Sequence, residues 1–161
     1  IELLSKNISS NNLTKNNQAI NLAEWITTIP ITYYPYGLKA AANRFKNSLQ
    51  ENSKSHAITE NIVEMCHNGI VSWEQDRKIQ PILIEGKNDY NKTKLLQKII
   101  KEYFVNNNID FRTVSSPSGS IITKLVYLIY LLDFVSIYKA IINEIDPTPV
   151  KSIEYLKSKF L

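Results

Sequence analysis

The chain has 161 residues, of which 43% are hydrophobic and 21% are charged, and its formal net charge is +4. These values are typical of one soluble globular domain with a sizeable core, and the lysines are too scattered to indicate nucleic-acid binding. The single cysteine, Cys66, excludes an internal disulfide, which either fits a reducing cytoplasm or says nothing about the compartment. The first residue is Ile and not Met, and no charged and then apolar leader follows it. We therefore expect a fragment, a trimmed chain or a partly ordered chain, and not a secreted precursor.

The first part of the chain predicts an arm, a helix and a strand. Residues 1–15 are polar and rich in Asn and Ser, so we expect a flexible arm or a linker from a preceding domain. Apolar residues recur with helical spacing over residues 16–28. Residues 29–34 are β-branched and aromatic, which favours a strand. We therefore expect the folded domain to cover residues 16–161.

The helix predicted over residues 38–54 carries the first candidate site residue. Its apolar residues form one stripe with helical spacing, namely Leu38, Ala41, Ala42, Phe45 and Leu49. Arg44 and Glu51 lie two turns apart along one edge of this stripe, so both could face one cleft. A half-buried carboxylate at such a place suits a general base. The alternative is that Glu51 is a solvated glutamate at a frayed helix end.

The next stretch, residues 57–70, has apolar residues with helical spacing, but Gly69 interrupts the pattern. His67 lies on the flank of this pattern, where an imidazole could give and take a proton near pH 7. The alternative is a surface or structural histidine. His56 has no pattern around it, and we expect it on the surface.

Strand and helix patterns alternate in the region that follows. Short apolar runs predict strands over residues 78–85 and 109–115. Between them, residues 89–105 have the spacing of an amphipathic helix.

Residues 120–145 are nearly long and apolar enough to span a membrane. Lys124, Asp133 and Lys139 argue against insertion, because each charge is unfavourable in lipid. We expect a helix buried at the domain centre or at a subunit interface. Asp133 should have a partner inside it, because an unpaired buried carboxylate is costly.

The closing helix, predicted over residues 149–161, contains one anomaly. Lys157 projects from the middle of its apolar stripe, whereas Lys151 and Lys159 lie outside the stripe. Such a lysine either extends its amine to the edge of the stripe or serves a site, and the pattern leaves both open. The alternation of strands and helices predicts an α/β fold, a three-layer sandwich with a mainly parallel sheet.

Two motifs connect these segments to a known family. The run LQENSK followed by EMCHNGIVSW resembles the second-domain signature of the bifunctional phosphoglucose/phosphomannose isomerases, in which an NENAK-like run precedes ELNHNE and a tryptophan. The segment DFVSIYKAIINEIDPTPVKSIEYLK resembles the closing pattern of the same family. The likeness runs from about Leu22 to Leu161 and concerns only the second of the family's two sugar isomerase (SIS) domains.

The resemblance implies a SIS-type, flavodoxin-like fold and an enzyme that interconverts glucose 6-phosphate or mannose 6-phosphate with fructose 6-phosphate through a cis-enediol. Glu51 matches the base that moves a proton between C2 and C1. His67 matches a histidine that assists ring opening from the partner subunit, and Lys157 matches a lysine near the ring oxygen. Arg44 is a further candidate for substrate binding.

The same resemblance implies a cytoplasmic homodimer of carbohydrate metabolism, in glycolysis and gluconeogenesis, that acts together with the N-terminal SIS domain of the same protein. No metal or cofactor is implied, and no nucleic-acid or membrane partner. Two departures stand out: His67-Asn68-Gly69 replaces the family's HNE and loses a carboxylate, and the strand Ile31–Tyr34 is aromatic, which puts the sugar preference in question. The alternative function is a stand-alone, non-catalytic domain that binds a sugar phosphate or a partner.

Overall fold

A parallel β-sheet forms the centre of the protein. The computed structural model describes residues 2–12, 16–75 and 78–160. Within these residues the sheet has four strands in the order β2-β1-β3-β4, namely β1 (Ile29–Tyr34), β2 (Ile58–Asn61), β3 (Ile79–Gly86) and β4 (Arg112–Ser116). Each neighbouring pair is parallel, and helices connect the strands, as short crossovers between parallel strands require. The predicted fold class is confirmed.

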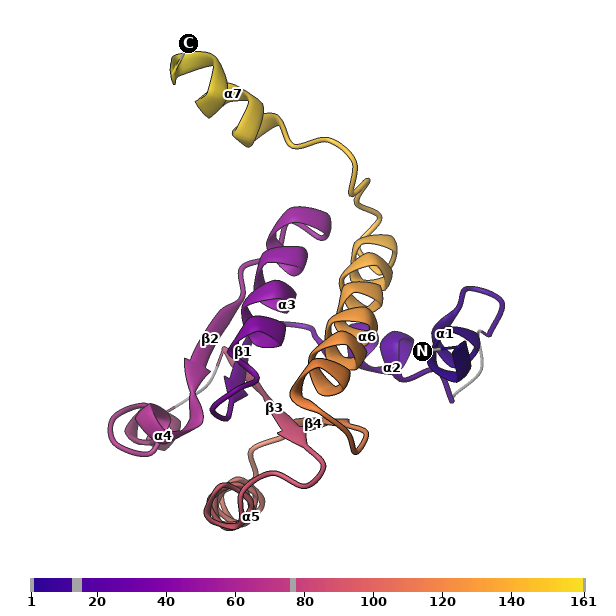
Figure 1. Cartoon of the computed structure of the whole chain (residues 1–161). Coiled ribbons are helices and arrows are strands. Elements are labelled where there is room, and N and C mark those ends of the chain that lie inside the picture. The colour runs from indigo at the N-terminus through magenta and orange to yellow at the C-terminus, as the bar shows by residue number, and fades with distance from the viewer. Residues whose placement is uncertain (1, 13–15, 76–77, 161) are drawn as a thin grey trace.

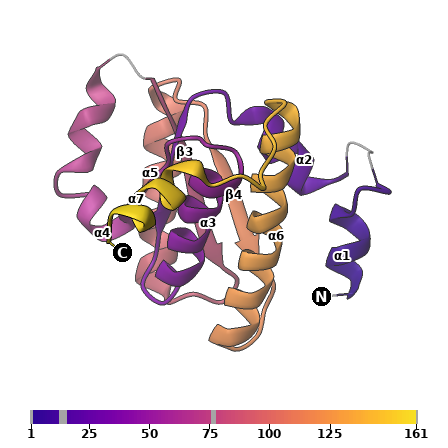
Figure 2. The same cartoon turned by 90° about the horizontal axis from the view of Figure 1, so that it is seen from above.

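Helices cover both faces of this sheet, as Figures 1 and 2 show. One face carries α1 (Glu2–Ile8), α2 (Gln18–Trp25), α3 (Lys39–Asn52) and α6 (Ile121–Ile142), and the other carries α4 (Ile62–Met65), the 3₁₀ helix η1 (Gly69–Glu74) and α5 (Asn91–Asn106). Alternate strand residues point to opposite faces, so Ile82 and Ile84 join the first core cluster while Leu83 joins the second. The last helix, α7 (Lys151–Phe160), extends away from this body.

The 22-residue helix α6 is long and apolar enough to cross a membrane by length and composition. In this fold it packs against α2 and α3 and contributes Leu128, Leu132 and Val135 to the core. Its buried Lys124 amine lies 2.8 Å from an oxygen of Asp89. The pairing of Lys124 fits the rule that a buried charge needs a partner. The helix is not buried on most sides, because it covers one face of the sheet and leaves Ile122, Val126 and Ile141 exposed.

The structure differs from the predicted elements in two places. The expected flexible arm contains α1, whose Leu4 and Ile8 are buried, and the Tyr138 hydroxyl donates to the Ile8 carbonyl at 2.5 Å. Residues 13–15 of that arm, and residue 161 of the predicted closing helix, lie outside the described residues.

The second difference is the stretch after α3, where the helical pattern of residues 57–70 is divided among β2, α4 and η1. The Asn61 side chain accepts a hydrogen bond from the Val63 amide at 2.8 Å and so begins α4 directly after the strand. The prediction of one interrupted helix was wrong because β2 is short and carries a single apolar residue, Ile58.

Hydrogen bonds to the Asp110 carboxylate, a titratable group, fix the end of α2 beside β4. The Trp25 Nε1 atom donates to Asp110 at 2.6 Å, and Arg112 donates to the same carboxylate at 2.6 Å. The hydrogen bond from Trp25, and then that from Arg112, hold the pKa of Asp110 below its ordinary value of 3.8. Because this carboxyl group has a lower pKa in the folded chain than in the unfolded chain, its charged form stabilises the fold at pH values above the unfolded pKa. That contribution is lost as the pH falls through the folded pKa.

We predict that the Trp25 indole N–H signal in the NMR spectrum shifts with pH and has a midpoint below 3.8. Trp25→Phe identifies the signal, and Asp110→Asn should abolish the transition because it removes the titrating group. A midpoint at or above 3.8 would contradict the hydrogen bond as the cause.

Candidate active site

Glu51 lies in the last turn of α3, at the edge of the sheet where the strands begin, because α3 leads from the end of β1 to the start of β2. It is exposed and borders a hollow of about 560 Å³ between the end of α3 and the start of α7. The lining residues are Gln50, Glu51, Lys54, Ile145, Asp146 and Pro149–Ile153. A volume of this size suits a small ligand.

Hydrogen bonds hold the walls of this hollow together. The Lys54 amine donates to the Glu51 carbonyl at 2.6 Å and to the Pro147 carbonyl at 3.3 Å, which joins α3 to the loop before α7. The Asp146 carboxylate accepts from the Thr148 amide at 2.9 Å. This bond to the backbone is the main reason that the pKa of Asp146 lies below its ordinary value. Negatively charged carboxylate residues and positively charged lysines therefore both border the hollow.

Lys157 is not among the lining residues of the hollow, and it is exposed. It follows Ile153, which does line the hollow, by four residues on α7. Residues four apart on a helix lie on the same face one turn apart. The structure therefore places Lys157 one turn beyond the hollow that Glu51 borders, on the same face of α7 as Ile153.

His67 lies at the opposite edge of the sheet. It follows β2 and α4 on the side where the strands end, and it is exposed. Its amide donates to the Glu64 carbonyl at 2.9 Å, so it belongs to the turn that closes α4. Figure 1 shows α4 at the other end of α3 from α7. A single copy of the chain does not bring His67 to the hollow beside Glu51.

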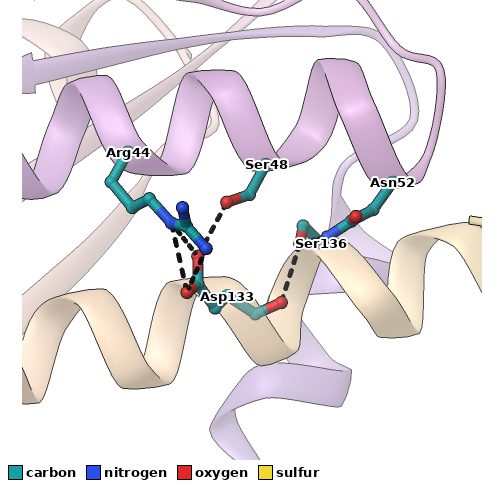
Figure 3. A network of polar contacts seen from close by, with 5 residues as sticks. All are labelled: Arg44, Ser48, Asn52, Asp133 and Ser136. Atoms are coloured by element: carbon teal, nitrogen blue, oxygen red, sulfur yellow. Dashed lines mark hydrogen bonds and ion pairs between the residues drawn. The ribbon is translucent and has the colours of Figure 1, made fainter. Parts of the chain in front are cut away.

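Arg44 is engaged within the chain, as Figure 3 shows. Its Nε atom lies 3.0 Å and its Nη2 atom 3.1 Å from oxygens of Asp133 on α6, and the Ser48 hydroxyl donates to the same carboxylate at 2.7 Å. The hydrogen bond to Asp133 is the main cause that raises the pKa of Arg44. Asp133 thus has the partner expected from the sequence, and Arg44 serves first to join α3 to α6.

A second contact continues this network toward Glu51. The Asn52 amide donates to the Ser136 hydroxyl at 2.8 Å, and that hydroxyl donates to the Asp133 carbonyl at 2.7 Å. These bonds fix the last turn of α3 against α6 and so fix the backbone that carries Glu51. The sequence patterns did not identify Lys54 and Lys151 as candidate site residues. Lys54 lies beyond the end of α3 with a positive φ of 54°, so helical spacing does not describe its position beside Glu51.

Among the described residues, no three His, Cys, Asp or Glu side chains gather where they could hold a metal ion.

Comparison with solved structures defines the class of fold. Superposition on a glucose-6-phosphate isomerase like protein from Thermus thermophilus gives a TM-score of 0.76 at 15% identity, over 97% of this chain and 52% of that one. At this identity the likeness shows the fold alone, which is the α/β sandwich of the SIS domains.

The sequence comparisons identify the family. Residues 15–160 match the family described as "Bacterial phospho-glucose isomerase C-terminal SIS domain". Proteins named "Bifunctional phosphoglucose/phosphomannose isomerase" are 31% identical in Aquifex aeolicus, over 81% of this chain, and 32% identical in Caldicellulosiruptor bescii, over 86%. The chain belongs to this SIS-domain family, and it spans 42% and 44% of the length of these two relatives.

We predict that Asp133→Ala lowers the free energy of unfolding by about 1–3 kcal/mol, because it leaves Ser48 and Arg44 without their shared acceptor. Chemical denaturation measures the change. Glu24→Ala is the matched control, since Glu24 is an exposed carboxylate on a neighbouring helix. Equal losses in the two variants would mean that the network does not join α3 to α6 in solution.

Proposed function

We propose that this chain is the C-terminal half of an aldose–ketose isomerase that interconverts glucose 6-phosphate, and mannose 6-phosphate, with fructose 6-phosphate through a cis-enediol. The observation that carries the proposal is family membership combined with the hollow at Glu51, which two carboxylate residues (Glu51 and Asp146) and two lysines (Lys54 and Lys151) line. The N-terminal SIS domain supplies the rest of the site, and two copies of the protein form a cytoplasmic homodimer.

The chemistry requires the residue types that this part of the chain presents. Glu51 takes the proton from C2 of the open-chain aldose phosphate and returns it to C1, while the hydroxyl proton on C2 passes to the oxygen on C1. The carboxylate must therefore reach both carbons. The Lys157 ammonium stabilises the negative charge that develops on the enediolate oxygen. His67 of a second copy moves the proton that opens the sugar ring, because an imidazole gives and takes protons near neutral pH.

The exposed surface of α7 supports a site completed by another domain. No side chain of this helix is buried, and its apolar residues Ile153, Leu156 and Phe160 are 41%, 57% and 88% exposed. Burying such side chains contributes about 1.5–3 kcal/mol each. We infer that α7 packs on the N-terminal SIS domain and that this docking brings Lys157 to the substrate beside Glu51.

A second candidate function is a stand-alone domain that binds a sugar phosphate or a partner without catalysis. It is favoured by one observation: Glu51, Lys157 and His67 do not line a common hollow in one copy of the chain. The encoding reading frame distinguishes the two candidates. An upstream SIS domain in frame supports the isomerase, and a start codon directly before Ile1 supports the stand-alone domain.

We predict that the 161-residue chain by itself has almost no isomerase activity, since its sequence contains no recognisable cradle for the substrate phosphate. A coupled assay of fructose 6-phosphate formation from glucose 6-phosphate measures this. Turnover by the isolated chain that disappears in Glu51→Gln would contradict the need for a second domain.

In the complete protein, Glu51→Gln should lower kcat by about 10²–10⁴, the range for loss of a general base. Lys157→Ala should also lower kcat, whereas Lys159→Ala on the same helix should leave it unchanged. Unfolding curves recorded on each variant separate loss of chemistry from loss of fold. Equal activity of the Lys157 and Lys159 variants would remove Lys157 from the site.

A further inference from the structure

A second hollow lies at the edge of the sheet where β1, β2 and β3 begin. It has a volume of about 430 Å³, which suits a small ligand. Its walls come from the chain that leads into each of these three strands and from the end of α6. It shares no lining residue with the hollow beside Glu51. It is lined by residues 26–29, Ser55, His56, Lys78, Lys139 and Asn143.

The charges that border this second hollow have one sign. Among its described lining residues the side chains of His56, Lys78 and Lys139 are basic and none is a carboxylate, whereas charges of both signs line the hollow beside Glu51. The nearby ends of α3 and α6 each carry a partial negative charge of about half a unit, and the two lysines together exceed it. An anion is therefore the ligand that this hollow favours.

Lys139 is the unusual member of this group, because it is only 8% exposed. It follows Leu132 by seven residues and Val135 by four, so it continues the stripe of α6 that packs in the core. Over residues 2–12, 16–75 and 78–160, no hydrogen bond or ion pair reaches its amine. Every fully buried side-chain nitrogen of these residues has a partner. The Lys139 amine therefore touches solvent, and the hollow is the solvent space that Lys139 lines.

The fold does not use this amine. A lysine near the end of a helix can stabilise the last carbonyl groups, but in α6 the backbone already does so. The amides of residues 143–145 donate to the carbonyls of residues 139–141 at 2.8–3.1 Å. Burial lowers the pKa of Lys139 below its ordinary value of 10.5, because the charged amine loses water. A buried ammonium without a partner is unfavourable for folding, and a bound anion would remove that penalty.

We propose that the hollow at Lys139 is a second binding site, and that it takes the phosphate group of a small ligand. The Lys139 ammonium supplies the buried contact, and the exposed Lys78 and His56 add positive charge. A phosphate monoester carries a charge of about −1.5 to −2 at pH 7, which two ammonium groups neutralise. Lysine binds phosphate as a point charge. The hollow also leaves room for an organic part, for which Ile26 and Ile29 offer an apolar surface.

The test is an NMR titration of the 161-residue chain with inorganic phosphate, at constant pH and ionic strength. Phosphate should shift the imidazole signals of His56, whereas those of His67, at the other edge of the sheet, should stay in place. Lys139→Met removes the charge and keeps an unbranched side chain, so it should weaken binding by about 10–100-fold, the range for a hydrogen bond to a charged group. Lys78→Met should weaken binding by about two- to fivefold, because an exposed charge contributes less.

A matched lysine and the unfolding temperature serve as controls. Lys94 is exposed and lines a different hollow, at the carboxyl-terminal edge of the sheet, together with three further lysines. Lys94→Met should leave phosphate binding unchanged. Phosphate should raise the unfolding temperature of the unmodified chain and of Lys94→Met, because a ligand that binds the folded state stabilises it. It should not raise that of Lys139→Met, which without phosphate should unfold at no lower temperature than the unmodified chain.

Glycerol 3-phosphate distinguishes the two sources of the phosphate group: tighter binding than inorganic phosphate assigns the site to a phosphorylated metabolite, and equal or weaker binding assigns it to free phosphate. No shift of His56, an equal shift with acetate, or equal losses in Lys139→Met and Lys94→Met would overturn the proposal. A lower unfolding temperature of Lys139→Met without phosphate would also overturn it, since the amine would then serve the fold. The readout involves neither Glu51 nor isomerisation, so this site and the proposed isomerase activity can fail separately.

Discussion

The parallel direction of all the described strands decides where each candidate residue lies. Every helix that joins two parallel strands begins at the edge where one strand ends and finishes at the edge where the next begins. Glu51 closes such a helix, so it lies at the amino-terminal edge of the sheet, whereas His67 follows the end of β2 and lies at the carboxyl-terminal edge. One copy of this fold therefore separates the carboxylate from the imidazole, and a site that uses both requires a second polypeptide surface.

The contact between α3 and α6 fixes the position of the hollow beside Glu51. An apolar helix of this length could rotate or slide against its neighbour, because its surface is similar on all sides. Asp133 removes this freedom, since Arg44 and Ser48 reach it from two successive turns of α3. Because Asp133 fixes how α6 is aligned along α3, it also fixes where the loop after α6 begins. This loop and Lys54 together form one wall of the hollow beside Glu51.

The strongest local patterns predicted correct elements for physical reasons. The strand 29–34 was predicted with the bounds of β1, because a β-branched and aromatic run is buried on both faces of a central strand. Strand β2 was missed because an edge strand needs few apolar residues, and helix α1 was missed because its two buried side chains are surrounded by polar ones.

The candidate site was only partly accessible from the sequence. Glu51 and Lys157 stood out by their position on apolar stripes, and the resemblance gave them roles. The neighbours of Glu51 in the hollow come from a loop far along the chain, which no local pattern could reveal.

A crystal structure of the complete protein with fructose 6-phosphate tests most directly whether Glu51 and Lys157 meet at the reacting carbons of a sugar phosphate. We expect a Glu51 carboxylate oxygen at about 3–3.5 Å from C1 and C2, the carbons between which it moves the proton. The Lys157 amine should lie at the same end of the sugar, and His67 should be contributed by the second copy. A sugar phosphate bound elsewhere, with Glu51 in open solvent, would contradict the proposed site.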